Sequence, residues 1–248
     1  MYFFSFQSYS AHCQLLLKLF PEMPMLLLAS SLSVHVLDYL LDKISSLFRF
    51  HNYSPLEKAY AVIPYLAGLS LRDISERYNL ISASRESVRE WVHRTSMLFN
   101  PSRKSRRIVA VDETVISLKG QRCFIWSAID VDSGEIIAVL VSRSRSLLNS
   151  LIFLKMVLKS CENRPLIVVD RGPWYPWALK RLGLEYVHET FGKRNRIERW
   201  FRELKDRTKR FYNNVNAKTM KSLEELVSAI ALIHNSLLQS TREGVIPG

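Results

Sequence analysis

Two aspartates each follow directly on a run of apolar residues. Asp112 follows residues 108–111 (IVAV), and Asp170 follows residues 166–169 (LIVV). Short apolar runs of this kind are typical of strands buried on both faces, where a lone carboxylate is costly unless it is paired or bound to a cation. If the two strands are neighbours in one sheet, the carboxylates meet and a divalent cation relieves their repulsion. Oxygen ligands favour Mg²⁺ or Mn²⁺, so the aspartates predict a divalent metal site.

A third carboxylate would complete such a site, and Glu198 is the candidate because it lies in a basic helix from which its side chain can reach back to the sheet. Other carboxylates compete for this place: Glu113, Asp130, Asp132, Glu189 and Glu203. Glu113 is the next residue after the first aspartate in the same strand, so we expect its side chain on the opposite face. Asp132 is explained by a hairpin turn. The pattern alone leaves Asp130 and Glu189 open.

A carboxylate triad holding two metal ions roughly 3.5–4 Å apart supports an in-line displacement at phosphorus. The helix around Glu198 supplies positive charge for a nucleic-acid backbone. Its nine basic residues, against three acidic ones, are Lys193, Arg194, Arg196, Arg199, Arg202, Lys205, Arg207, Lys209 and Arg210. Lys205 lies seven residues after Glu198, two helical turns along the same face, and can contact a phosphate beside the metals. The alternatives are a solvated helix with internal ion pairs and, for each aspartate alone, a structural cap or ion pair.

The elements that must position these residues alternate strands and helices. We expect three antiparallel strands at residues 108–118, 123–130 and 135–142, joined by turns at 119–120 and 132–134. A helix at 147–161, a strand at 166–170, a helix at 174–182, a strand at 185–189 and helices at 194–212 and 223–238 follow. This order predicts the α/β, ribonuclease-H-like fold, a mixed sheet of three antiparallel strands and then parallel strands, flanked by helices.

Ahead of the strands, three short helices are predicted at 54–67, 71–78 and 84–98. A helix, a tight turn and a second amphipathic helix form a helix-turn-helix unit, whose exposed side chains reach phosphates and base edges. The candidate contacts here are Arg72, Ser84, Arg85, Ser87, Arg89 and Arg94. On the basic helix they are Lys193, Arg194, Arg199 and Arg202. A plain three-helix bundle with solvated polar faces is the alternative.

The chain of 248 residues is predicted to contain four parts. They are a poorly patterned segment (1–53), a helix-turn-helix DNA-binding domain (54–99), a basic linker (100–107) and a catalytic domain (108–240). The net charge of +12 indicates a polyanionic partner, with nucleic acid ahead of an anionic membrane surface. Three scattered cysteines exclude a disulfide framework or a zinc knuckle and fit a reducing interior. Charged residues interrupt the apolar stretch 23–48, so no membrane span is expected.

Three stretches in a fixed order resemble insertion-sequence transposases of the DDE type, closest to the archaeal branch near insertion-sequence family six. They are VAVDETVISLKGQRCFIWSAIDVDSGEIIAV, VVDRGPWY and HETFGKRNRIERWFRELKDRTKRF. The resemblance implies a ribonuclease-H-like catalytic domain, magnesium dependence and a helix-turn-helix that binds terminal inverted repeats. Carried over by motif, the catalytic carboxylates are Asp112, Asp170 and Glu198, and the basic residue seven positions later is Lys205.

The expected protein is therefore a transposase that binds the terminal inverted repeats of an insertion sequence and uses Mg²⁺ or Mn²⁺, two ions, to cleave and transfer DNA strands. Its partners would be double-stranded DNA, at the element ends and the target, and further copies of itself, as a homodimer or higher oligomer. It would lie in the cytoplasm at the nucleoid. A catalytically inactive copy acting as a DNA-binding protein is one alternative. A nuclease of the same fold acting on hybrids or branched DNA is another.

Overall fold

The molecule is described from a computed structural model. The residues it describes are 32–189, 192, 194–211, 214–215, 217 and 219–242. The first part of the N-terminal segment and the candidate DNA contact Lys193 lie outside them.

The central sheet is mixed, and its strand order is β3-β2-β1-β4-β5. The strands are β1 (Ile108–Leu118), β2 (Gln121–Asp130), β3 (Ile136–Ser142), β4 (Leu166–Val169), β5 (Tyr186–His188) and a short β6 (Asn214–Val215) that pairs with β1. The first three are antiparallel, whereas β1, β4 and β5 run parallel. This arrangement confirms the predicted ribonuclease-H-like fold. The hairpin between β1 and β2 turns at Lys119 and Gly120, both with positive φ (49° and 77°), as a two-residue turn of this hand requires.

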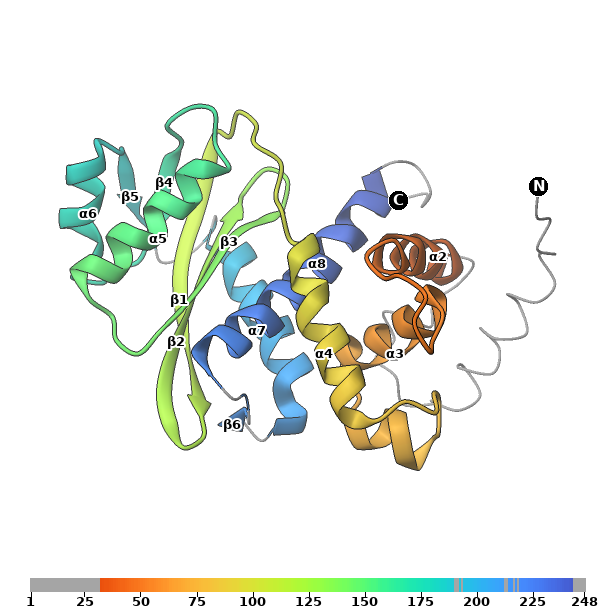
Figure 1. Cartoon of the computed structure of the whole chain (residues 1–248). Helices are drawn as coiled ribbons and strands as arrows, with labels where there is room; N and C mark the ends of the chain where they lie inside the picture. Colours follow the sequence, from red (N-terminus) through yellow and green to blue (C-terminus); the bar gives the residue numbers. More distant parts are fainter. Residues whose placement is uncertain are drawn as a thin grey trace.

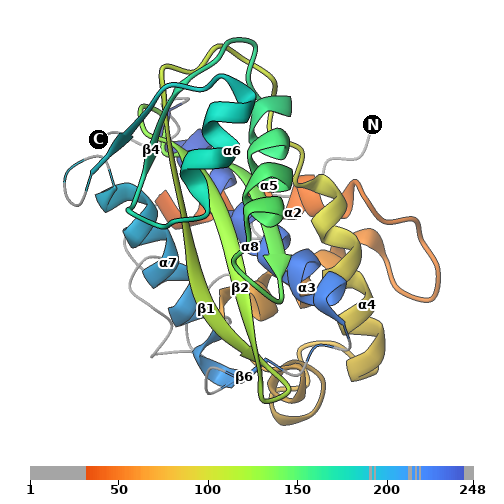
Figure 2. The ribbon, with the colours of Figure 1, turned by 90° about the vertical axis from the view of Figure 1, so that its left-hand side faces the viewer.

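Helices cover both faces of the sheet (Figure 1). On one face lie α5 (Leu147–Lys159) and α6 (Tyr175–Leu182), and on the other lie α7 (Asn195–Thr208) and α8 (Met220–Arg242). Figure 2, turned by a quarter, shows α5 and α6 side by side in front of the strands. Because strands in the middle of the sheet are buried on both faces, β1 and β4 carry continuous apolar runs, as the sequence analysis assumed.

The N-terminal region is helical, as predicted, and begins earlier than the sequence analysis placed it. Its elements are α2 (Leu32–Ser45), α3 (Pro55–Ala67), a π-helical turn (Asp73–Arg77), α4 (Arg85–Thr95) and a 3₁₀ turn (Ser96–Leu98). A capping box between Ser54 and Glu57 starts α3, and the Ser84 side chain caps α4. Helix α2 lies in the poorly patterned segment 1–53, where no helix is predicted, and it packs on α3 and α8.

One hydrophobic core joins the helical region to the sheet. Helix α8 contacts β3 as well as α2, α3 and α4, and buried side chains from all of these belong to the same cluster. Two polar contacts cross the same boundary. Nδ1 of His93 on α4 lies 2.9 Å from Oε2 of Glu225 on α8, and Arg207 on α7 donates to the carbonyl of Leu66 at 3.3 Å. The helical region therefore packs directly against the α/β part.

The segment before β1 is tied into the sheet by Arg106, which is 1% exposed. Its guanidinium donates to Asp130 at 2.8 Å, to Glu135 at 3.1 Å and to the carbonyl of Ser160 at 3.0 Å. The end of the predicted basic linker is therefore part of the core. Among the helices that the structure describes, none combines the length and apolar character needed to cross a membrane.

Candidate active site

Asp112 lies in the middle of β1 and is 7% exposed. Its Oδ1 accepts a hydrogen bond from the backbone N–H of Glu113 at 2.9 Å, and its Oδ2 accepts one from Nη2 of Arg194 at 2.6 Å. Burial raises the pKa of this carboxyl, and repulsion from Asp170 adds to the rise, although the Arg194 guanidinium opposes it. The carboxylate is thus buried with less positive charge than its ionised form needs.

Asp170 follows the end of β4 and is half-buried. In the parallel pair of β1 and β4, Ala110 faces Val168, so the two aspartates lie at equal distances beyond that pair. Asp170 accepts a hydrogen bond from the backbone N–H of Gly172 at 2.8 Å. A Cβ on Gly172 would lie 2.9 Å from Oδ1 of Asp170 and 2.7 Å from the indole of Trp174. Only glycine fits here without moving the aspartate.

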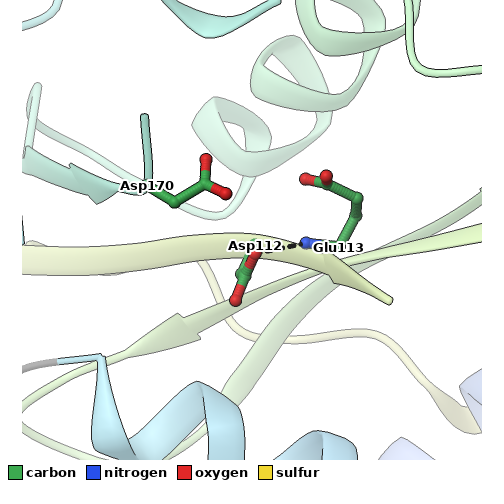
Figure 3. A group of neighbouring side chains, drawn as sticks. All are labelled: Asp112, Glu113 and Asp170. Atoms are coloured by element: carbon green, nitrogen blue, oxygen red, sulfur yellow. Dashed lines mark hydrogen bonds between the residues drawn. The ribbon is translucent and has the colours of Figure 1, made fainter. Parts of the chain in front are cut away.

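Glu113 joins the two aspartates. One carboxylate oxygen from each of Asp112, Glu113 and Asp170 lies within 4.8 Å of the others, a grouping that could hold a metal ion. Figure 3 shows that Glu113 leaves β1 on the opposite side from Asp112, as alternation predicts, and that Asp170 lies on the side of Glu113. Glu113 therefore lies on the expected face, and its carboxylate still comes close to both aspartates, which the sequence analysis did not anticipate. Asp170 stands past the end of its strand, where the pleat no longer sets the side-chain direction.

The Glu113 carboxylate is held by two donors. The hydroxyl of the fully buried Tyr175 donates to it at 2.6 Å, and Nη1 of Arg145 lies at 3.4 Å. The Arg145 guanidinium is itself stacked 4.5 Å from the ring centre of Trp174. Burial raises the pKa of Glu113, and the two neighbouring aspartates raise it further. Burial and the Glu113 carboxylate also raise the pKa of Tyr175 far above its usual range, so this hydroxyl remains a donor.

On α7, Glu198 and Lys205 are both exposed and lie on one face of the helix. Glu198 is not part of the group formed by Asp112, Glu113 and Asp170. Arg194, the residue before α7, interacts electrostatically with both Glu198 and the aspartates. Burial would lower the pKa of its guanidinium, but the negative charges of Asp112, Asp170 and Glu198 outweigh this effect and raise the pKa. The structure thus brings the two predicted aspartates together and does not bring Glu198 into their group.

Most of the competing carboxylates are paired with basic side chains elsewhere in the fold. Asp130 is bonded to Arg106, Asp132 lies 2.7 Å from Arg107, and Glu203 accepts from Arg207 and lies 2.8 Å from Nδ1 of His234. These contacts give each a structural role. Glu189 follows β5 and is half-buried, and its carbonyl lies 3.5 Å from Nη1 of Arg194.

A sequence profile described as a DDE domain matches residues 106–240, more than half of the chain. The chain belongs to the DDE family of insertion-sequence transposases. An uncharacterised protein of Methanocaldococcus jannaschii is 42% identical over 169 residues, which cover 67% of this chain and 79% of that protein. The transposase for insertion sequence element IS257 in transposon Tn4003 of Staphylococcus aureus is 26% identical over 192 residues, 71% of this chain and 85% of that protein.

The IS257 relative agrees with the resemblance to insertion-sequence family six. Among solved structures, the catalytic core domain of BIV integrase matches 50% of this chain and 83% of its own length, at 19% identity and a TM-score of 0.38.

In this DDE-family chain the predicted DNA contacts fall into three sets. Several arginines of the helix-turn-helix region pair with acids, since Arg85 lies 2.9 Å and Arg72 3.5 Å from Glu76, and Arg89 is bonded to Glu86. Ser84 caps α4 through the backbone N–H of Ser87, and the two hydroxyls lie 2.9 Å apart.

Arg94, Arg199 and Arg202 form the second set, which is exposed and makes no ion pair within the part of the chain that the structure describes. Arg194 stands apart, because its guanidinium lies against Asp112 rather than in solvent, with the side chain 12% exposed. No local pattern predicts this contact, which joins residues 82 positions apart.

Proposed function

We propose that this chain binds the terminal inverted repeats of an insertion sequence and catalyses metal-dependent cleavage and transfer of DNA strands. The observation that carries the proposal is the group of three acid side chains within a DDE domain. Asp112 and Asp170 come from neighbouring strands, and Asp112, Glu113 and Asp170 have oxygens within 4.8 Å of one another.

The chemistry of this group fits a hard divalent cation. All the donor atoms are carboxylate oxygens, which Mg²⁺ and Mn²⁺ prefer. Burial raises the pKa of both Asp112 and Glu113, so the group is short of positive charge when it is ionised. When bound there, two such ions would supply Lewis-acid activation of the attacking and leaving oxygens at phosphorus.

The residues of this chain divide the work. Asp112 on β1 and Asp170 just after β4 would hold the metal, and Glu198 on α7 would complete the ligand set. Arg194, which donates to Asp112, would have to release this carboxylate for a metal to bind there. Lys205 lies two turns beyond Glu198 on the same face and holds a phosphate next to the reacting one.

Binding of duplex DNA is assigned to two surfaces. The helix-turn-helix region contributes α4 with Arg72, Ser84, Arg85, Ser87, Arg89 and Arg94. The basic helix contributes Lys193, Arg194, Arg199 and Arg202. Bringing two element ends together requires at least two copies of the chain, so a homodimer or larger assembly is part of the proposal.

The test uses the full chain and a duplex carrying the inverted repeat that flanks its gene. With Mg²⁺ or Mn²⁺, the chain should nick the element end and join it to a second duplex. Asp170→Asn should abolish both steps and leave the affinity for the duplex unchanged. A variant that still cuts and joins would refute the assignment. Binding by the unaltered chain with no nicking at any metal concentration would support a DNA-binding protein without catalysis.

A further inference from the structure

A pocket of about 530 Å³ lies between the loop that joins α2 to α3 and one face of α4. Basic side chains surround it: Arg49, His51, Lys58 and Arg94. Among the described residues that line it, the one carboxylate is Glu90, which is exposed. The pocket thus has an excess of positive charge, and it lies outside the acid group of the DDE domain.

Lys58 is the feature that points to a ligand. It is 6% exposed, and its Nζ donates to the carbonyl of Arg49 at 2.9 Å. The ammonium also lies 5.9 Å and 5.7 Å from the ring centres of Phe48 and Trp91. An ammonium has three donors, and no carboxylate pairs with this one in the described part of the chain. A buried cation without an anion is costly, and an incoming anion removes that cost.

The walls of the pocket are built rather than loose. His51 and Tyr53 exchange backbone hydrogen bonds, which closes a tight turn at Asn52 (φ 61°). The Tyr53 hydroxyl donates to the carbonyl of Ser82 at 3.0 Å, and its ring lies 5.4 Å from that of Trp91. The loop is therefore fixed onto α4 and the turn before it.

The side of the pocket opposite this loop is a face of α4, formed by Ser87, Glu90, Trp91 and Arg94. These positions are three, four and seven residues apart and share one side of the helix. Arg94 packs its guanidinium 5.8 Å from the ring centre of Phe48 and makes no ion pair among the described residues. By contrast, Arg85 and Arg89 on the same helix are paired with acids. The uncompensated positive charge of this region gathers at the pocket.

We propose that this pocket receives a phosphate of the DNA backbone next to the groove that α4 enters. Arg49 and Arg94 contact its oxygens at the mouth, and Lys58 attracts it from below. Glu90 opposes binding by repulsion. The inference rests on the DNA binding in the proposed function and does not depend on strand cleavage.

The test measures affinity of the full chain for two duplexes of equal length, the element end and a scrambled sequence, over a salt series. Arg49→Gln and Arg94→Gln should each weaken binding to both duplexes about tenfold, because phosphate contacts carry little sequence information. Each should also reduce the salt slope by about 0.9, the contribution of one phosphate contact. Glu90→Gln should tighten binding to both.

Lys155→Gln is the matched control, because Lys155 is exposed on α5 and its loss removes the same charge far from the pocket. If Arg49→Gln and Arg94→Gln bind DNA as Lys155→Gln does, the pocket does not hold a backbone phosphate. The same conclusion follows if the two arginine variants lose affinity for inorganic phosphate but keep their affinity for both duplexes. It also follows if the unaltered chain binds neither duplex.

Thermal melting of each variant separates lost binding from lost folding. If the pocket variants lose affinity for DNA as expected but the unaltered chain cleaves no DNA, the phosphate-binding role of the pocket is supported and the catalytic proposal is refuted.

Discussion

The central sheet carries two groups of buried carboxylates, and they differ in what neutralises them. Asp130 and Glu135 share the guanidinium of Arg106, at 2.8 and 3.1 Å, and Asp130 also accepts the backbone N–H of Asp132 at 3.0 Å. Lys104 lies 2.8 Å from Glu135. These partners belong to the folded chain itself, so the negative charge of this group is balanced without any bound ion.

The group formed by Asp112, Glu113 and Asp170 has fewer partners. Arg194 contacts one of its members, and Arg145 reaches Glu113 only at 3.4 Å. Burial raises the pKa of Asp112 and of Glu113, which means that the ionised group still lacks positive charge. Burial of a carboxylate therefore does not by itself identify a functional site. A functional site is indicated when the chain supplies too little positive charge to balance the buried carboxylates.

The largest expected effect separates the two groups by activity. Asp112→Asn should reduce cleavage of the element end by about 10³-fold or more, as removal of a catalytic group does. Asp130→Asn, the matched change in the other group, should leave the rate per folded molecule unchanged. Nicking assays normalised to the folded fraction give the measurement. Equal losses in both variants would erase the distinction.

The next effect separates the groups by stability. Arg106→Gln leaves Asp130 and Glu135 buried without their shared cation, which should lower the free energy of unfolding by about 3–5 kcal/mol. Arg145→Gln removes an arginine from the other group, where the contact is long and partly exposed, and should cost much less. Urea denaturation in the absence of metal compares the two variants. A larger loss for Arg145→Gln would reverse the assignment.

Two acids on α7 extend the comparison. Burial would raise the pKa of Glu203, but hydrogen bonds from His234 and Arg207 outweigh it and lower the pKa. A carboxyl with a lowered pKa stabilises the fold above its unfolded pKa of about 4.3, and loses that contribution as pH falls through the folded pKa. Glu203→Gln should therefore cost about 1–3 kcal/mol at pH near 7.

The difference in unfolding free energy between the unaltered chain and Glu203→Gln should disappear at acid pH. Glu198→Gln should leave the unfolding free energy unchanged at both neutral and acid pH, but it should abolish strand cleavage. Urea denaturation at neutral and acid pH, together with the nicking assay, tests both changes. If Glu198→Gln cuts normally, Glu198 is not the third ligand, and Glu113 becomes the carboxylate to change next.

The smallest expected effect concerns Arg194, whose guanidinium lies against Asp112. If a metal ion replaces Arg194 at Asp112, Arg194→Gln should tighten Mn²⁺ binding by about tenfold, or about 1.4 kcal/mol. Calorimetric titration of the full chain with Mn²⁺ measures this without any DNA. Arg199→Gln, which removes an exposed cation of the same helix, should leave the affinity nearly unchanged. Weaker binding by Arg194→Gln would show that the arginine supports the metal instead of competing with it.

Local patterns in the sequence were enough to locate the strands and the two aspartates. Apolar runs that end in an acid predicted β1 and β4, and the turn at Lys119 and Gly120 followed from residue type. Glu113 was missed because alternation describes the direction of Cβ and not the reach of a long side chain toward a residue beyond a strand end.

Long-range contacts could not be predicted in the same way. The bond from Arg194 to Asp112 joins residues 82 positions apart, and that from Arg106 to Asp130 joins residues 24 apart. Nothing in the local sequence distinguishes these arginines from their solvent-exposed neighbours. Helix α2 did carry a local signal, because its buried residues Leu40, Leu41 and Ile44 have helical spacing, but the apolar stretch around it concealed the pattern.

Helix α8 forms part of the core under the sheet and also supports α4. Glu224 accepts the backbone N–H of Val141 at 2.8 Å, while its neighbour Glu225 faces His93 on α4. A single helix therefore fixes the position of α4 relative to the sheet that carries the acid group. If α4 holds the DNA, moving its recognition sequence by one base pair along an element end should move the cut made by the same chain by one base pair.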